Sequence, residues 1–165
     1  MTGIRGEALR DLESLSRRRL NLARQYSALS AAALLCLESG DIDGFLAYAD
    51  ERAAHTARID EATAAMEKGI ARLGPFYASV VRMILTPGRK AAACPQWCQT
   101  LASDQAMLAK LLSNCLSMNA RMEAHARAHT EQMREQHTRA HANRKLRSRY
   151  GTYAEPGTRI KYTSK

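Results

Sequence analysis

The stretch SGDIDGFLAY, residues 39–48, decides how this chain of 165 residues folds. Gly40 tolerates the left-handed conformation in which many helices end, and it follows a long helical pattern. Asp41 is a good N-cap for a second helix that opens with the residues after it. A connection as short as residues 39–41 joins two helices only as antiparallel neighbours. The stretch therefore predicts a helical hairpin.

Apolar residues recur at helical spacing on both sides of this turn. The helix before it is predicted over residues 6–39, with an apolar face at Leu9, Leu12, Leu15, Leu22, Tyr26, Leu29, Ala33 and Leu37. The sequence SRRR at 16–19 lies mostly off that face. The second helix follows from Asp41, and its face alternates steps of three and four residues through Phe45, Tyr48, Arg52, His55, Ile59, Ala62, Met66, Ile70 and Leu73.

The rest of the chain predicts a short helix and a long one. Gly74 and Pro75 end the second helix, and the apolar run at 76–85 is expected to be helical because a lone strand would have no partner. A loop at 86–95 precedes a helix from about Pro95 to Arg147, roughly 50 residues and about 75 Å long if unbroken.

Composition agrees with an all-α fold. Aromatic residues make up 5% of the chain, and no alternating Val-rich run predicts a sheet. We predict an antiparallel helical hairpin packed with a long C-terminal helix, an elongated bundle of three to four helices. The predicted bundle domain is 1–147, and 148–165 is a basic tail.

Location and redox state follow from the apolar runs and the cysteines. The N-terminal residues show no signal-peptide pattern, and the longest nearly apolar run, 28–37, is about half the length of a membrane span. We therefore predict a cytoplasmic protein without membrane insertion. Cys94 and Cys98 are four residues apart, which differs from a zinc knuckle or a thioredoxin-type pair, so free thiols are expected.

Positive charge is concentrated near the C-terminus. Residues 134–165 hold nine Lys and Arg against Glu135 and Glu155, a net charge of +7 out of +9 for the whole chain. Such an arm is expected to meet an acidic partner. No helix-turn-helix or finger signature accompanies it, so nucleic acid is a lesser expectation than protein.

The chain lacks the patterns of an enzyme or a metal protein. There is no phosphate loop, nucleophile elbow or pair of carboxylates in an apolar setting, so no enzyme and no cofactor are predicted. The pairs His125 and His129, and His137 and His141, have a spacing that can hold a metal. The carboxylate partners of di-iron bundles are missing, and we interpret these histidines as polar positions on a helix.

One face of the long helix, within MLAKLLSNCLSMNARM at 107–122, is rich in Leu and Met. It is either bundle core or a groove for another protein's amphipathic helix, a role that suits flexible Met side chains. The candidate residues are Leu108, Leu111, Leu112, Cys115, Met118 and Met122.

Three features together resemble FlgN-type flagellar export chaperones. They are the SGDIDGFLAY junction between two regularly spaced helices, the long last helix bearing Asn114 and Asn119, and the sequence YGTYAEPG that begins at Tyr150. The junction is also similar to that of FliT-type chaperones, and the excess of Arg and His in 121–149 departs from the family pattern.

The resemblance implies a small helical chaperone without ATPase activity. It would bind C-terminal helices of hook-associated (junction) proteins in the cytoplasm and escort them to the flagellar export gate. The six candidate residues above would then bind cargo, and Tyr150, Gly151 and Tyr153 would dock on the gate. Two alternatives stay open: a helical protein that binds nucleic acid through its basic arm, and a structural coiled-coil subunit that forms a homo-oligomer.

Overall fold

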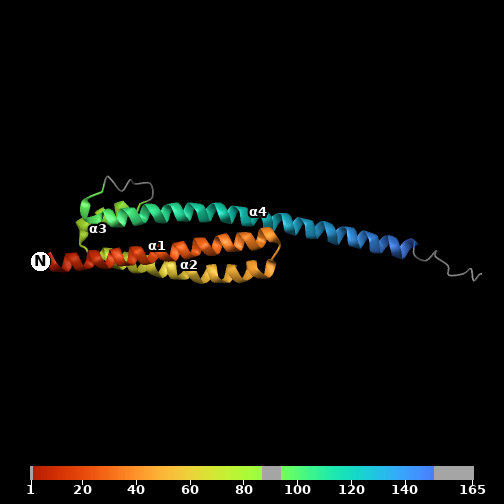
Figure 1. The fold of residues 1–165 in the computed structure, drawn as a ribbon, viewed down its shortest axis with the longest axis horizontal. Coiled ribbons are helices and arrows are strands. Elements are labelled where there is room, and N and C mark those ends of the chain that lie inside the picture. The colour runs from red at the N-terminus through yellow and green to blue at the C-terminus, as the bar shows by residue number, and fades with distance from the viewer. Residues whose placement is uncertain (1, 87–93, 151–165) are drawn as a thin grey trace, which may run out of the picture. The chain divides into compact units, whose positions relative to one another are not determined.

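The protein is all-α, as predicted. The computed structural model describes residues 2–86 and 94–150, with side chains for 6–86 and 94–148. The helices in these ranges are α1 (Thr2–Ser39), α2 (Ile42–Ala71), α3 (Pro75–Leu85), a 3₁₀ turn (Gln96–Cys98) and α4 (Gln99–Tyr150), with no strand among them (Figure 1). No helix in the described residues is both long and apolar enough to cross a bilayer.

The turn between α1 and α2 forms as the sequence predicts. Gly40 has φ of 80°, and the backbone N–H of Asp41 donates to the carbonyl of Cys36 at 2.8 Å, which closes the end of α1 in a Schellman arrangement. The Asp41 side chain accepts a hydrogen bond from the N–H of Gly44 at 2.9 Å and caps α2. The two helices therefore lie antiparallel.

A second left-handed glycine ends the hairpin. Gly74 has φ of 79°, and Pro75 occupies the first turn of α3, where its missing N–H costs nothing. The helix predicted at 76–85 is confirmed. Pro95 precedes the 3₁₀ turn, so α4 begins four residues later than predicted. Most of the predicted loop, 87–93, lies outside the described residues.

The core is formed where α1, α2 and α4 meet. Leu12 shares a buried cluster with Met66, Ile70 and Leu101, and further along the bundle Leu34 shares one with Met122. From one cluster to the next, the contacting residues have rising numbers in both α1 and α4, whereas the numbers fall along α2 as they rise along α1. Hence α4 runs parallel to α1, and α3 packs at the end of the bundle where Leu12 lies.

The core side of α4 repeats every seven residues. Leu101, Leu108, Cys115 and Met122 are all buried, and each lies seven positions after the one before. A strict seven-residue repeat keeps one seam facing its neighbours only if the helices supercoil gently to the left. In each of these core clusters the seam residue of α4 packs against α1. All of them belong to the first of two compact units of the chain, residues 1–125, which we call unit 1.

Two polar side chains of α1 correct the sequence interpretation. SRRR at 16–19 was expected mostly off the buried face, but Ser16 and Arg19 are both buried. Arg19 Nη2 donates to Oε1 of Gln105 at 2.6 Å, and Nε2 of Gln105 donates to the carbonyl of Leu85 at 2.9 Å. Burial lowers the pKa of Arg19, and the nearby Asp104 carboxylate opposes that shift.

Residues 126–165 form a second unit of the chain. Its described part is the helical segment 126–150, and every side chain described from 126 to 148 is exposed. The helix ends at Tyr150, three residues after the predicted end. The rest of the predicted tail, 151–165, lies outside the described residues.

Candidate protein-binding surface

The structure divides the six predicted cargo-binding residues among three environments. Leu108, Cys115 and Met122 are buried in the core, where a partner has no access to them while the bundle is closed. Leu111 and Met118 are half-buried, and Leu112 is 42% exposed. The face that reads as one stripe in the sequence is therefore a core seam with an accessible position on each side.

Leu111 and Met118 lie on the edge of α4 that adjoins α1. Two polar contacts define this edge. Nη2 of Arg24 lies 2.9 Å from Sδ of Met107, and Arg121 forms an ion pair with Glu38. Nε2 of His125 is also 3.7 Å from Oε1 of Glu38. The two contacts are separated by the same number of residues on each helix, which again shows a parallel pair in register.

Between these contacts the edge is apolar on α1, and on α4 it is apolar except at Asn114, an exposed residue seven positions after Met107. On α1, Ala28, Ala31 and Leu35 follow Arg24 at four, seven and eleven residues, which keeps them on one side of the helix. On α4, Leu111 and Met118 follow Met107 at four and eleven residues. We name this surface the α1–α4 strip, consisting of Ala28, Ala31, Leu35, Met107, Leu111 and Met118.

Large side chains of the α1–α4 strip are open to solvent. Leu35 is 66% exposed and Met107 is 44% exposed. Arg24 and Arg121 flank the strip at its two ends, and Glu38 is engaged with Arg121 and His125. Exposed apolar side chains with a charged border are typical of a surface that binds another protein.

Leu112 lies on the other edge of α4, toward α2. Its neighbour on that edge is Leu116, which is 70% exposed. Seven residues after Leu112, Asn119 accepts a hydrogen bond at 2.5 Å from Nη2 of Arg52 on α2. This edge therefore offers two accessible leucines on α4 beside a polar contact.

Arg52 joins the three long helices of unit 1. Its Nη2 also donates to the hydroxyl of Tyr26 at 3.0 Å, and the guanidinium lies 5.1 Å from the centroid of the Tyr26 ring. Nη1 is 3.7 Å from Sδ of Met122. Charge-assisted hydrogen bonds of this kind add directional contacts that position α4 against the hairpin.

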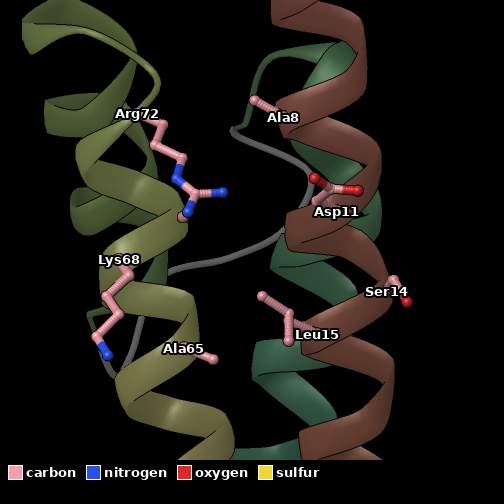
Figure 2. A pocket seen from close by; sticks show the side chains of 8 residues that line it. Ala8, Asp11, Ser14, Leu15, Ala65, Lys68 and Arg72 are labelled. Carbon is pink, nitrogen blue, oxygen red and sulfur yellow. The ribbon is translucent and has the colours of Figure 1, made fainter.

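A groove lies between α1 and α2 where residues near the start of α1 face residues near the end of α2 (Figure 2). Its volume is about 390 Å³, and Gly69 lies in its wall. Figure 2 shows Arg72 extending from α2 toward α1, on which Asp11 lies, with Lys68 one turn away. These exposed side chains carry mixed charge.

A smaller pocket has an aromatic wall. Leu9, Leu73, Tyr77 and Trp97 line a space of about 320 Å³, and the Tyr77 and Trp97 rings meet edge to face at 5.4 Å. Apolar contacts of this kind stabilise the end of the bundle where α3 packs.

Cys94 packs against the buried cluster that contains Cys98, so these two thiols are neighbours, but the described ranges, 2–86 and 94–150, hold no larger group of metal ligands. No three His, Cys, Asp or Glu side chains converge there, and the four cysteines form no disulfide. Cys98 is buried and its thiol donates to the carbonyl of Pro95 at 3.1 Å. Burial raises the pKa of the Cys98 thiol.

The predicted docking residues fall at the limit of the described chain. Tyr150 is the last residue of α4, and its side chain is not described. Gly151 and Tyr153 lie outside the described residues, so their role stays a prediction.

Comparison with protein-family models, with curated proteins and with solved structures finds no significant match for this chain.

Proposed function

We propose that the protein is a FlgN-type export chaperone that binds an amphipathic helix of a hook-associated (junction) protein and escorts it to the flagellar export gate. The observation that carries the binding step is the α1–α4 strip. It presents exposed Leu35 and Met107 beside half-buried Leu111 and Met118. The apolar face of a partner helix could therefore contact α1 and α4 at the same time. The flagellar cargo itself comes from the sequence resemblance.

The dimensions of the strip suit a helix of a few turns. From Arg24 to Leu35 is eleven residues, which is about 16 Å along α1. A partner helix covers that length with apolar residues at i, i+3 or i+4, and i+7. Acidic residues beside that apolar stripe would meet Arg24 and Arg121 at the two ends.

Binding of this kind is expected to be moderate and reversible. Export cargo segments that fold on binding lose about 2–5 kcal/mol of the gross interaction in ordering. The α1–α4 strip offers only a few exposed apolar side chains, because other apolar residues of α4 are buried in the core. The binding free energy it supplies should therefore exceed that ordering cost only moderately. Moderate affinity suits a chaperone that must release its cargo at the gate.

The test uses the full chain and a synthetic C-terminal peptide of a junction protein from the same genome, with binding followed by calorimetry. Leu35→Gln is expected to weaken binding about tenfold or more, because burying a Leu side chain is worth about 1.5–3 kcal/mol. Gln is a good helix former, and Leu35 is mostly exposed, so the fold should be retained.

Leu116→Gln is the matched control. Leu116 is exposed to a similar degree on α4 but lies on the edge toward α2. Equal losses in the two variants would refute the strip as the seat, and unchanged binding in Leu35→Gln would do the same. A stable oligomer without peptide affinity, seen by sedimentation, would favour a structural coiled-coil subunit instead.

A further inference from the structure

The second unit carries a cationic stripe that the proposed cargo-binding role does not use. Arg127, Thr130, Arg134, His137, His141, Arg144 and Ser148 follow one another at alternating steps of three and four residues. That alternation places them on one side of the helical segment 126–150. Lys145 adjoins the stripe four residues after His141. We define these eight residues as the basic stripe.

The basic stripe contains no acidic residue. Carboxylates lie beside it and before it: Glu131 is 3.9 Å from Arg134, and Glu135 is 3.3 Å from Arg139, a residue off the stripe. Glu123 lies four residues before Arg127, on the same side of the helix. Thr130 turns its hydroxyl back to the carbonyl of Ala126 at 2.8 Å. The outward-reaching groups are therefore guanidinium, ammonium and imidazole donors, about one per helical turn.

The other sides of this segment do not suit a membrane. A helix that lies in a bilayer surface needs a continuous face of large apolar residues opposite its cations. Away from the basic stripe the segment instead carries Ala128, Gln132, Gln136 and Asn143. Met133 and Leu146 are its exposed large apolar side chains, and they lie on different sides of the helix.

We propose that the basic stripe binds the phosphate backbone of duplex nucleic acid. All side chains described from 126 to 148 are exposed, so the whole basic stripe is open to solvent. An α-helix with its side chains is about 10–12 Å across, and the major groove of B-DNA is about 12 Å wide. From Arg127 to Ser148 the stripe extends about 32 Å, close to the length of one turn of the duplex. Arginine and imidazole N–H groups along one side of the helix donate to phosphate oxygens on one wall of the groove without reading sequence.

This assignment is independent of the cargo-binding strip, and it needs no base-reading motif. Contacts to phosphates alone give binding that is sequence-tolerant and strongly weakened by salt. The signature expected is therefore similar affinity for unrelated duplex sequences and a steep dependence on ionic strength.

The test measures fluorescence anisotropy of a labelled DNA duplex of about 20 bp, roughly two turns, with the full chain at about 50 to 200 mM salt. The paired variant Arg134→Gln with Arg144→Gln removes two cations of the basic stripe. It is expected to weaken binding about tenfold or more and to reduce the slope of log affinity against log salt by about two.

The paired variant Arg139→Gln with Arg147→Gln is the matched control. It removes the same charge from the same helix, and each pair includes one arginine that has an ion pair with a glutamate. The control should lose clearly less affinity. Equal losses would overturn the basic stripe in favour of diffuse net charge.

Three further outcomes would also overturn the assignment. They are absence of duplex binding at about 50 mM salt, tighter binding to phosphatidylserine vesicles than to the duplex, and tighter binding to polyglutamate than to the duplex. Circular dichroism of both paired variants checks that their helix content equals that of the parent chain.

Discussion

Gly69 lies where α2 packs tightly against α1, and replacing it with alanine tests that packing. A Cβ atom at Gly69 would lie 2.8 Å from Cδ2 of Leu12 and 3.3 Å from its Cγ. Leu12 is completely buried in the core cluster with Met66 and Ile70, so its side chain has little room to move aside. Overpacking of a filled core costs about 1–3 kcal/mol.

Helix propensity opposes that cost. Alanine in a helix interior is more favourable than glycine by about 1 kcal/mol. We therefore expect Gly69→Ala to lower the free energy of unfolding by about 1 kcal/mol net, within a range of roughly 0–2. Urea unfolding followed by circular dichroism at fixed slope measures the change.

Two variants separate the packing cost from the propensity gain. Ala64→Gly, at an exposed position of α2, measures propensity alone and should cost about 1 kcal/mol. In a Leu12→Ala background the space beside Gly69 is empty, and Gly69→Ala should there stabilise the protein by about 1 kcal/mol. If Gly69→Ala stabilises both backgrounds equally, the close approach of α1 and α2 at this glycine is refuted.

The remaining predictions concern the contact that fixes α4 and the buried thiol. In a double-mutant cycle of Arg52→Met and Asn119→Leu, measured by urea unfolding, we expect a coupling free energy of about 1–2 kcal/mol. The reason is that the hydrogen bond between the two side chains is charge-assisted. A coupling near zero would show that this contact does not stabilise the bundle. Cys98 should react with iodoacetamide at least about tenfold more slowly in the folded chain than in urea, because burial both shields the thiol and raises its pKa and so lowers its thiolate fraction; equal rates in the two conditions would contradict its buried position.

The hairpin is predictable from sequence because its determinants are local. Gly40 and Asp41 act within the turn itself, through a left-handed φ and a side-chain cap three residues away. The face predicted for α2 from Phe45 to Leu73 is also confirmed, since each of its positions is buried or half-buried. Even Arg52, which interrupts that face in the sequence, lies on it in the structure.

The residues that sequence reasoning misplaced depend on partners far away in the chain. Arg19 looks like a surface residue until Gln105 of α4 supplies a hydrogen-bond acceptor 86 positions later. Ser16 is buried beside it, although its hydroxyl has no hydrogen-bond partner among the described residues. Likewise, the accessible edge of α4 depends on where α1 lies beside it. Half of the α1–α4 strip belongs to α1, so the pattern of α4 alone could predict Leu111 and Met118 but could not separate them from the buried Leu108 and Cys115.

The parallel register of α1 and α4 has a consequence for how the chain folds. Contacts within the hairpin begin at the turn and grow outward, so each new pair closes only a slightly longer loop than the last. Contacts between α1 and α4 have no such short start: the pairs Arg19 with Gln105, Arg24 with Met107 and Glu38 with Arg121 are 86, 83 and 83 residues apart. The entropy cost of closing the loop is therefore nearly the same for each of these pairs. Once the first pair has formed, the remaining pairs lose little additional loop entropy. We expect the hairpin to form first, growing outward from its turn, and α4 to dock in one late step. Kinetic φ-values from folding rates of point mutants should then be near zero along the α4 seam and higher for mutations beside Gly40.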